Sequence, residues 1–155
     1  MYGFSAVTPN PARPDLGRFL LEQNRQTRRG NTIAGEAWQE LVDGKKSRHW
    51  MHVIFPNPPF GRTRRSRWFA LASRQEAELF ASHPVLGSRL ITLSEVVARW
   101  GGQRSLRDIF GRVDAMKFRS SMTVFSEVNE CDVFAAALAA HGVSSDPAAL
   151  EWLDR

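Results

Sequence analysis

The sequence contains very little cysteine and very little lysine. Cys131 is the single cysteine among 155 residues, so a framework of intramolecular disulfides is excluded. Lysine occurs only as Lys45, Lys46 and Lys117, and arginine therefore carries most of the formal net charge of +5. Such a bias toward arginine follows from the base composition of a genome as readily as from phosphate binding. The charge alone therefore does not predict nucleic-acid binding.

The sequence also lacks long apolar runs. No run approaches the roughly 20 residues that a membrane helix needs, and the N-terminus does not have the basic-then-apolar order of a signal peptide. We therefore expect a protein of the reducing cytoplasm with no membrane partner. Alternating strand patterns and internal repeats are missing too, whereas 43% of the residues are hydrophobic, enough for one core. The sequence leaves the oligomeric state undetermined.

The prolines at the start of the chain divide it into two parts. Pro9, Pro11 and Pro14 stand among small polar residues and predict a flexible arm over residues 1–14, followed by a single domain over 15–155. Apolar spacing, caps and terminal glycines predict helices in that domain near 16–23, 37–42, 74–81, 84–100, 105–110, 116–128, 133–141 and 147–153. The fold class we expect is all-α, a compact multihelical domain joined by loops that contain proline and glycine.

Three of these helix starts rest on local capping chemistry. Ser73 with Glu76 has the spacing of a capping box, Ser105 with Asp108 is typical of a helix cap, and Asp146 precedes a proline at the first helical position. The stretch 50–60 has no helical spacing and several prolines, so we interpret it as a buried turn or a short extended piece.

Two segments, 44–56 and 109–125, have polar residues where a core pattern would place apolar ones. With the motifs Arg18-Phe19 and 83–90, they resemble domain-of-unknown-function family number 1810, small bacterial proteins sometimes labelled calpastatin-like. The resemblance covers about residues 16 to 141, implies an all-helical domain and implies no established reaction. Departures from the family pattern are His52, where an aromatic is usual, Asn57, where glutamine is usual, and a loop made more basic by Arg64 and Arg65.

The second polar segment suggests an anion site. Lys117 provides a positive charge and Ser120, Ser121 and Thr123 provide hydroxyl groups, a set suited to a phosphate or carboxylate. One alternative is that Ser120 or Ser121 caps a helix. Another is that Lys117 activates Ser121 as a nucleophile from one helical step away.

The first polar segment supplies the other candidate contacts. Lys46 and Arg48 add positive charge, although Lys45 and Lys46 also suit the negative end of the preceding helix. Trp50 and Phe55 would stack a planar ring, with a core position as the alternative.

Candidate catalytic groups lie in both segments. His49 is the candidate acid or base, and Asp114, preferred over Glu40, is the carboxylate that cleavage of an N-glycosidic bond would need. His49 and His52 would meet one metal ion only on a helix, which the nearby prolines disfavour, so no metal and no cofactor is expected.

Two hypotheses about function follow. The first is a ligand-binding or enzymatic domain whose pocket takes a small anionic molecule, such as ADP-ribose or a nicotinamide nucleotide, with N-glycosidic hydrolysis as the reaction to test. The second is a noncatalytic module that binds nucleic acid or an acidic protein through Arg62, Arg64, Arg65 and Arg67. A purely structural role for both polar segments is a third interpretation.

Overall fold

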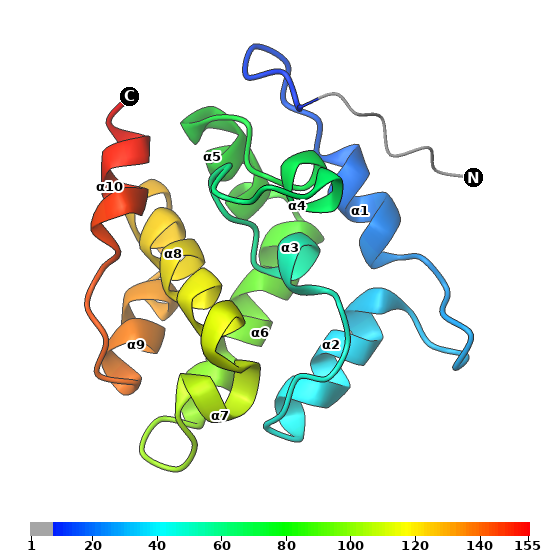
Figure 1. Ribbon diagram of the computed structural model, residues 1–155, viewed down its shortest axis with the longest axis vertical. Helices are drawn as coiled ribbons and strands as arrows, with labels where there is room; N and C mark the ends of the chain where they lie inside the picture. Colours follow the sequence, from blue (N-terminus) through cyan, green and yellow to red (C-terminus); the bar gives the residue numbers. More distant parts are fainter. Residues whose placement is uncertain (1–7) are drawn as a thin grey trace.

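The computed structural model describes residues 8–155, which form ten helices and contain no strand beyond one isolated bridge between Gln26 and Thr32 (Figure 1). The all-α prediction is therefore confirmed. The helices are α1 (Gly17–Gln23), α2 (Ile33–Val42), α3 (Met51–Ile54), α4 (Arg64–Trp68), α5 (Arg74–Ser82), α6 (Leu86–Arg99), α7 (Leu106–Phe110), α8 (Arg112–Val128), α9 (Val133–Ala140) and α10 (Pro147–Leu153).

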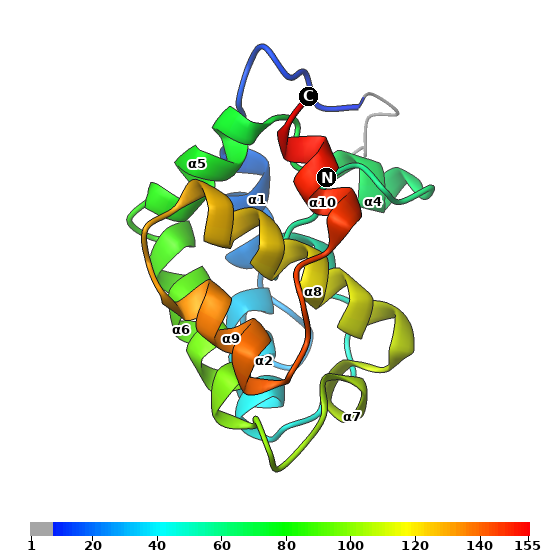
Figure 2. The same cartoon turned by 90° about the vertical axis from the view of Figure 1, so that its left-hand side faces the viewer.

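The longest helix, α8, occupies the centre of one side of the molecule. It packs against α5, α7, α9 and α10, while α6 packs against α2, α5 and α9. Figure 1 shows α8, α9 and α10 on the left and α1 and α2 on the right, and Figure 2 shows the left-hand side in front. The core between these two groups of helices is rich in aromatic rings. Phe118 meets Phe55 edge-on with ring centroids 5.0 Å apart, and Phe19 meets Phe80 in the same way at 5.1 Å.

Local capping chemistry sets several helix starts, as predicted. Ser105 and Asp108 form a complete capping box at α7, and the Asp146 carboxylate accepts a hydrogen bond from the N–H of Ala148 at α10. At α5 only half of the box forms. The Ser73 hydroxyl accepts from the N–H of Glu76 at 3.1 Å, but the Glu76 carboxylate accepts from Arg18 and from two other backbone N–H groups.

The segment after Trp50 differs from its prediction. Met51–Ile54 form the short helix α3 in place of a turn or extended piece, because one helical turn buries Met51, Val53 and Ile54 together before Pro56. Burial of three apolar side chains offsets the weak local preference for a helix this short.

Helix α8 begins earlier than its predicted start. It starts directly after Gly111, whose φ of 80° ends α7 and starts α8. Ser120 and Ser121 consequently lie in the middle of a 17-residue helix, so the interpretation of either as a cap is wrong.

Two further predictions concern the chain start and the arginine-rich stretch. Half of the predicted arm, residues 1–7, lies outside the described residues, and its flexibility stays a prediction. Within the described half, the Asn10 side chain accepts from the N–H of Ala12 in a turn. The arginine-rich stretch forms the surface helix α4, and no helix among the described residues is long and apolar enough to span a membrane.

Candidate functional site

The two polar segments meet at one carboxylate. Asp114, in the first turn of α8, lies with one oxygen 2.8 Å from Nζ of Lys46 and with the other 3.6 Å from Nζ of Lys117. The Lys46 side chain is only 8% exposed, whereas that of Lys117 is 32% exposed. We call Lys46, His52, Asp114 and Lys117 the lysine cluster.

Lys46 is held in place by backbone and aromatic contacts. Its N–H donates to the carbonyl of Ile109 at the end of α7, at 2.7 Å, and its ammonium lies 5.2 Å from the centroid of the Trp50 ring. Trp50 is 1% exposed and packs in the core, and Phe55 is fully buried. Neither ring is open to stack a ligand, so both have the core position that was the alternative interpretation.

Glu40 of α2 anchors the segment that carries Lys46. Its carboxylate accepts from the N–H groups of Ser47 and Arg48, from the Arg48 guanidinium at 2.8 Å and from the indole N–H of Trp50. Burial would raise the pKa of Glu40, but these hydrogen bonds outweigh burial and lower it. Glu40 and Arg48, both predicted at the site, are thus engaged in holding this loop.

The histidine of the cluster is His52 and not the predicted His49. Helix α3 carries His52 into the cluster, whereas His49 precedes the helix and is exposed. Burial, and then the charges of Lys117 and Arg65, lower the pKa of His52 to about 4. The imidazole is therefore neutral at pH 7. Asn57, five residues after His52, donates from its side chain to the carbonyl of Lys117 at 3.0 Å.

The hydroxyl groups predicted to accompany Lys117 face the core. Ser120 donates to the Asp146 carboxylate at 2.6 Å, and the Thr123 hydroxyl donates to the Arg119 carbonyl and accepts from the N–H of Asp146. Ser121 is fully buried and its hydroxyl has no partner among the described residues. Lys117 therefore shares a surface with Asp114 and His52, and these hydroxyl groups belong to the packing of α8 against the chain before α10.

The arginine cluster divides into one paired and three unpaired members. Arg65 donates to the Glu22 carboxylate at 3.0 Å and lies with its guanidinium 5.1 Å from the centroid of Phe69. Arg62, Arg64 and Arg67 are exposed and have no ion pair with any of the described acidic residues.

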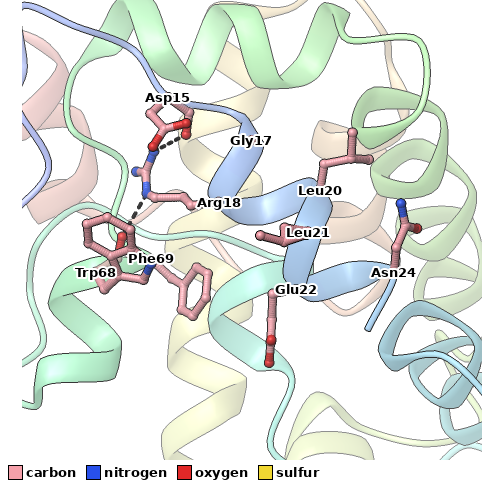
Figure 3. Close-up of a pocket in the computed structure, with 9 residues that line it drawn as sticks. All are labelled: Asp15, Gly17, Arg18, Leu20, Leu21, Glu22, Asn24, Trp68 and Phe69. Carbon is pink, nitrogen blue, oxygen red and sulfur yellow. Dashed lines mark hydrogen bonds between the residues drawn. The ribbon is translucent and has the colours of Figure 1, made fainter. Parts of the chain in front are cut away.

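A hollow of about 510 Å³ lies between α1 and α4 (Figure 3). Its walls are mostly apolar, and residues from both helices line it: Leu20, Leu21, Trp68 and Phe69. This hollow was not predicted, although the adjacent leucines Leu20 and Leu21 on a short helix were a signal, because they place apolar surface on more than one face.

Comparison with known proteins assigns the chain to a family. The family described as "Protein of unknown function (DUF1810)" matches residues 13–153. The chain belongs to this family. The structure of the conserved hypothetical protein Rv1873 from Mycobacterium tuberculosis is similar to this DUF1810 chain, with a TM-score of 0.82 and 30% identity over 92% of this chain and 98% of that one. No curated protein matches the sequence of this DUF1810 chain.

The donor groups of this DUF1810 chain suit an anion better than a metal. Among the described residues, no three His, Cys, Asp or Glu side chains are placed to hold a metal ion. The lysine cluster instead offers two ammonium groups, one carboxylate and a neutral imidazole, and both ammonium groups are donors for phosphate or carboxylate oxygens.

Proposed function

We propose that the protein binds a small anionic molecule through a phosphate or carboxylate group at the lysine cluster. The observation that carries the proposal is the use of lysine. The chain has three lysines, and two of them, Lys46 and Lys117, converge on the single carboxylate of Asp114. Two positive charges share one negative charge, which leaves the cluster with a surplus positive charge for a ligand.

An ion pair between lysine and a carboxylate is unusual among the described residues of this molecule. The buried carboxylates of Glu22, Glu36, Glu40 and Glu76 are all paired with arginine. The planar guanidinium fits a fixed carboxylate, whereas an ammonium on a flexible stem turns its three donors toward a second acceptor more easily. This difference supports a role for Lys46 and Lys117 beyond holding the fold together.

The start of α8 supports the same proposal. Arg112 and Val113 open the helix directly after Gly111, and backbone N–H groups in a first turn favour negative charge nearby. His52 adds an imidazole that stays neutral at pH 7 and accepts or donates a hydrogen bond without adding charge.

The ligand class we infer is a nucleotide, with N-glycosidic hydrolysis as the reaction to test. In that reaction the bond between the sugar carbon and the base nitrogen breaks, water supplies a hydroxyl to the carbon, and its proton goes to the leaving base. Asp114, whose carboxylate lies between two ammonium groups, would stabilise the positive charge that develops on the sugar. His52, on which the charge of Asp114 acts, takes the place of His49 as the candidate imidazole.

The experiment is a titration calorimetry series with inorganic pyrophosphate and with ADP-ribose. Wild-type protein is compared with Lys117→Gln and with Lys45→Gln, because Lys45 is exposed and lies outside the cluster but carries the same charge. We expect Lys117→Gln to weaken binding by about tenfold or more, the value of one charge-assisted hydrogen bond, and Lys45→Gln to have little effect. Equal losses in the two variants, or no binding to wild type, would contradict the proposal. Product analysis by chromatography then tests turnover of ADP-ribose.

A second candidate function is nucleic-acid binding by α4 and the residues just before it. The exposed arginines Arg62, Arg64 and Arg67 have no described acidic partner, and this supports a surface for phosphates. Binding of short single-stranded DNA should weaken steeply with salt and be lost in the triple alanine variant of these arginines. Retention of binding in that variant would rule this function out.

A further inference from the structure

We propose that the hollow between α1 and α4 holds the planar ring of the ligand whose phosphate binds the lysine cluster. This inference rests on the proposed function and specifies the ligand as a purine or pyridine nucleotide. The hollow would be the ring subsite and the lysine cluster the phosphate subsite, with Arg65 between them.

The dimensions and walls of the hollow suit a ring. Its volume of about 510 Å³ is in the range of small-molecule sites. Leu20 and Leu21 of α1 line it together with Trp68 and Phe69, and in Figure 3 the Leu21 side chain points toward the side where Trp68 and Phe69 lie. Leu21 is 56% exposed, an apolar side chain that the fold itself leaves uncovered. A planar ring between these walls would remove that apolar surface from water.

Two charged side chains that line the hollow, Arg18 and Glu22, are already paired. All five N–H groups of Arg18 are used, because they donate to the carbonyls of Asp15, Trp68 and Ala70 and to both oxygens of Glu76. Glu22 is likewise paired with Arg25 and Arg65. Arg18, the cation that lines the hollow, is therefore not available to a phosphate, and we assign the phosphate of the ligand to the lysine cluster.

Arg65 connects the hollow to the lysine cluster. It contacts two residues that line the hollow, with a hydrogen bond to Glu22 and its guanidinium over the ring of Phe69. The same guanidinium donates to the carbonyl of His49 at 3.4 Å, and its charge acts on His52. Figure 1 shows α3, which carries His52, between α1 and α8. Arg65 thus contacts two residues of the ring subsite and the chain just before α3, and its charge reaches the His52 imidazole of the phosphate subsite.

Asn24 provides a polar group at the rim of the hollow. Its side-chain oxygen accepts from the guanidinium of Arg89 at 2.8 Å, which fixes the orientation of the amide. The amide nitrogen is then the donor for a ring nitrogen of the ligand. One oriented donor in an apolar site is the arrangement that selects a heteroaromatic ring over a plain hydrocarbon.

The experiment compares AMP with ribose 5-phosphate, which has the same sugar phosphate without the ring. Binding is measured by calorimetry on wild type, Leu21→Ala, Leu79→Ala and Lys117→Gln. Leu79 is the matched control, because it is a 41%-exposed leucine on α5 outside the hollow. Both leucine variants change exposed positions and are expected to fold.

We expect wild type to bind AMP at least tenfold more tightly than ribose 5-phosphate. Leu21→Ala should remove most of that difference and leave the affinity for ribose 5-phosphate unchanged, Leu79→Ala should change neither, and Lys117→Gln should weaken both. The methyl NMR signals of Leu20 and Leu21 should shift with AMP and not with ribose 5-phosphate.

Two results would overturn the inference in distinguishable ways. If ribose 5-phosphate binds and depends on Lys117, but AMP binds no more tightly or Leu21→Ala and Leu79→Ala behave alike, the ring subsite is wrong and the proposed function stands. If neither ligand depends on Lys117, the proposed function is wrong, and with it the assignment of the hollow as part of the same site.

Discussion

Arg18 and Glu76 form an ion pair that water does not reach, with side chains 2% and 0% exposed. The pair joins α1 to α5 across a long separation in sequence. Glu76 also accepts hydrogen bonds from the N–H groups of Asp15 and Ala72, so its carboxylate fixes the chain on both sides of the hollow.

Glu76→Gln should strongly destabilise the protein. The amide keeps the shape of the side chain but leaves the Arg18 charge buried without a counter-charge, which typically costs about 3–5 kcal/mol. Urea denaturation followed by circular dichroism measures the loss. Glu78→Gln on the exposed side of the same helix is the control and should stay within about 0.5 kcal/mol of wild type. A loss below about 1 kcal/mol for Glu76→Gln would show that the pair contributes little.

Ser121 and Thr123 offer a paired test on α8. Ser121→Ala removes a fully buried hydroxyl that has no hydrogen-bond partner among the residues that the structure describes. We expect this change to raise the free energy of unfolding by up to about 1 kcal/mol. Thr123→Val removes a hydroxyl with two partners and should cost about 1–3 kcal/mol. Chemical denaturation of both variants measures the difference. A marked loss in Ser121→Ala would show that its hydroxyl has a partner in solution.

Glu36 should make part of the stability sensitive to acid. The Arg29 hydrogen bonds, against the opposing effect of burial, lower the pKa of Glu36 from 4.5 to about 2. The unfolded chain thus takes up this proton at higher pH than the folded one, so the stabilisation is complete above about pH 4.5 and is lost as the pH falls toward 2. Because Arg29 is half exposed, we expect a contribution of only about 1 kcal/mol.

The measurement for Glu36 is the thermal midpoint of wild type and Glu36→Gln between pH 2 and 7. The gap between the two proteins should close over the acid range, and Glu151→Gln, in an exposed ion pair, should show no such gap. A gap that stays constant with pH would mean that the effect of Glu36 is not electrostatic.

His52 should titrate far below an ordinary histidine. Its pKa of about 4, against an ordinary 6.5, means that the unfolded chain is protonated first as the pH falls, so the unfolding free energy decreases between pH 6.5 and 4. NMR of the imidazole signals measures the midpoint directly. Lys117→Gln should raise the pKa, because the Lys117 charge contributes to lowering it, and bound pyrophosphate should raise it too. A midpoint near 6.5 that neither change moves would contradict the environment described for His52.

Local chemistry was sufficient to predict the helices that begin at strong caps. Ser105 and Asp108 satisfy each other's backbone N–H groups whatever the rest of the chain does. Asp146 likewise caps α10 locally, because its side chain accepts from a backbone N–H and a proline follows at the first helical position. Helix α3 lacks any such cap. It forms because its surroundings bury three of its four residues, which no local pattern reveals.

The candidate site was predictable as two segments but not as a set of contacts. Lys46, Asp114 and Lys117 were candidates from sequence, but their convergence depends on the packing of α7 and α8 against the loop after α2. The serines near Lys117 were predicted to join it at the anion site. They lie instead on the buried side of the continuous helix α8. His49 was preferred because it fits the family pattern and His52 departs from it, whereas the turn of helix that carries His52 to the cluster has no local signal in the sequence.

Gly111 has a consequence for ligand size. It is the C-cap of α7 and the N-cap of α8, so this one residue joins the two helices. Ile109, just before it, binds the backbone of Lys46, while Lys117 follows on α8. The torsion angles of this glycine therefore help to set how the backbone of Lys46 lies relative to the helix that carries Lys117. A side chain at this position has free space for its Cβ, but it would strain a φ of 80°. Such a substitution would change which anions fit at the lysine cluster without altering any charged residue.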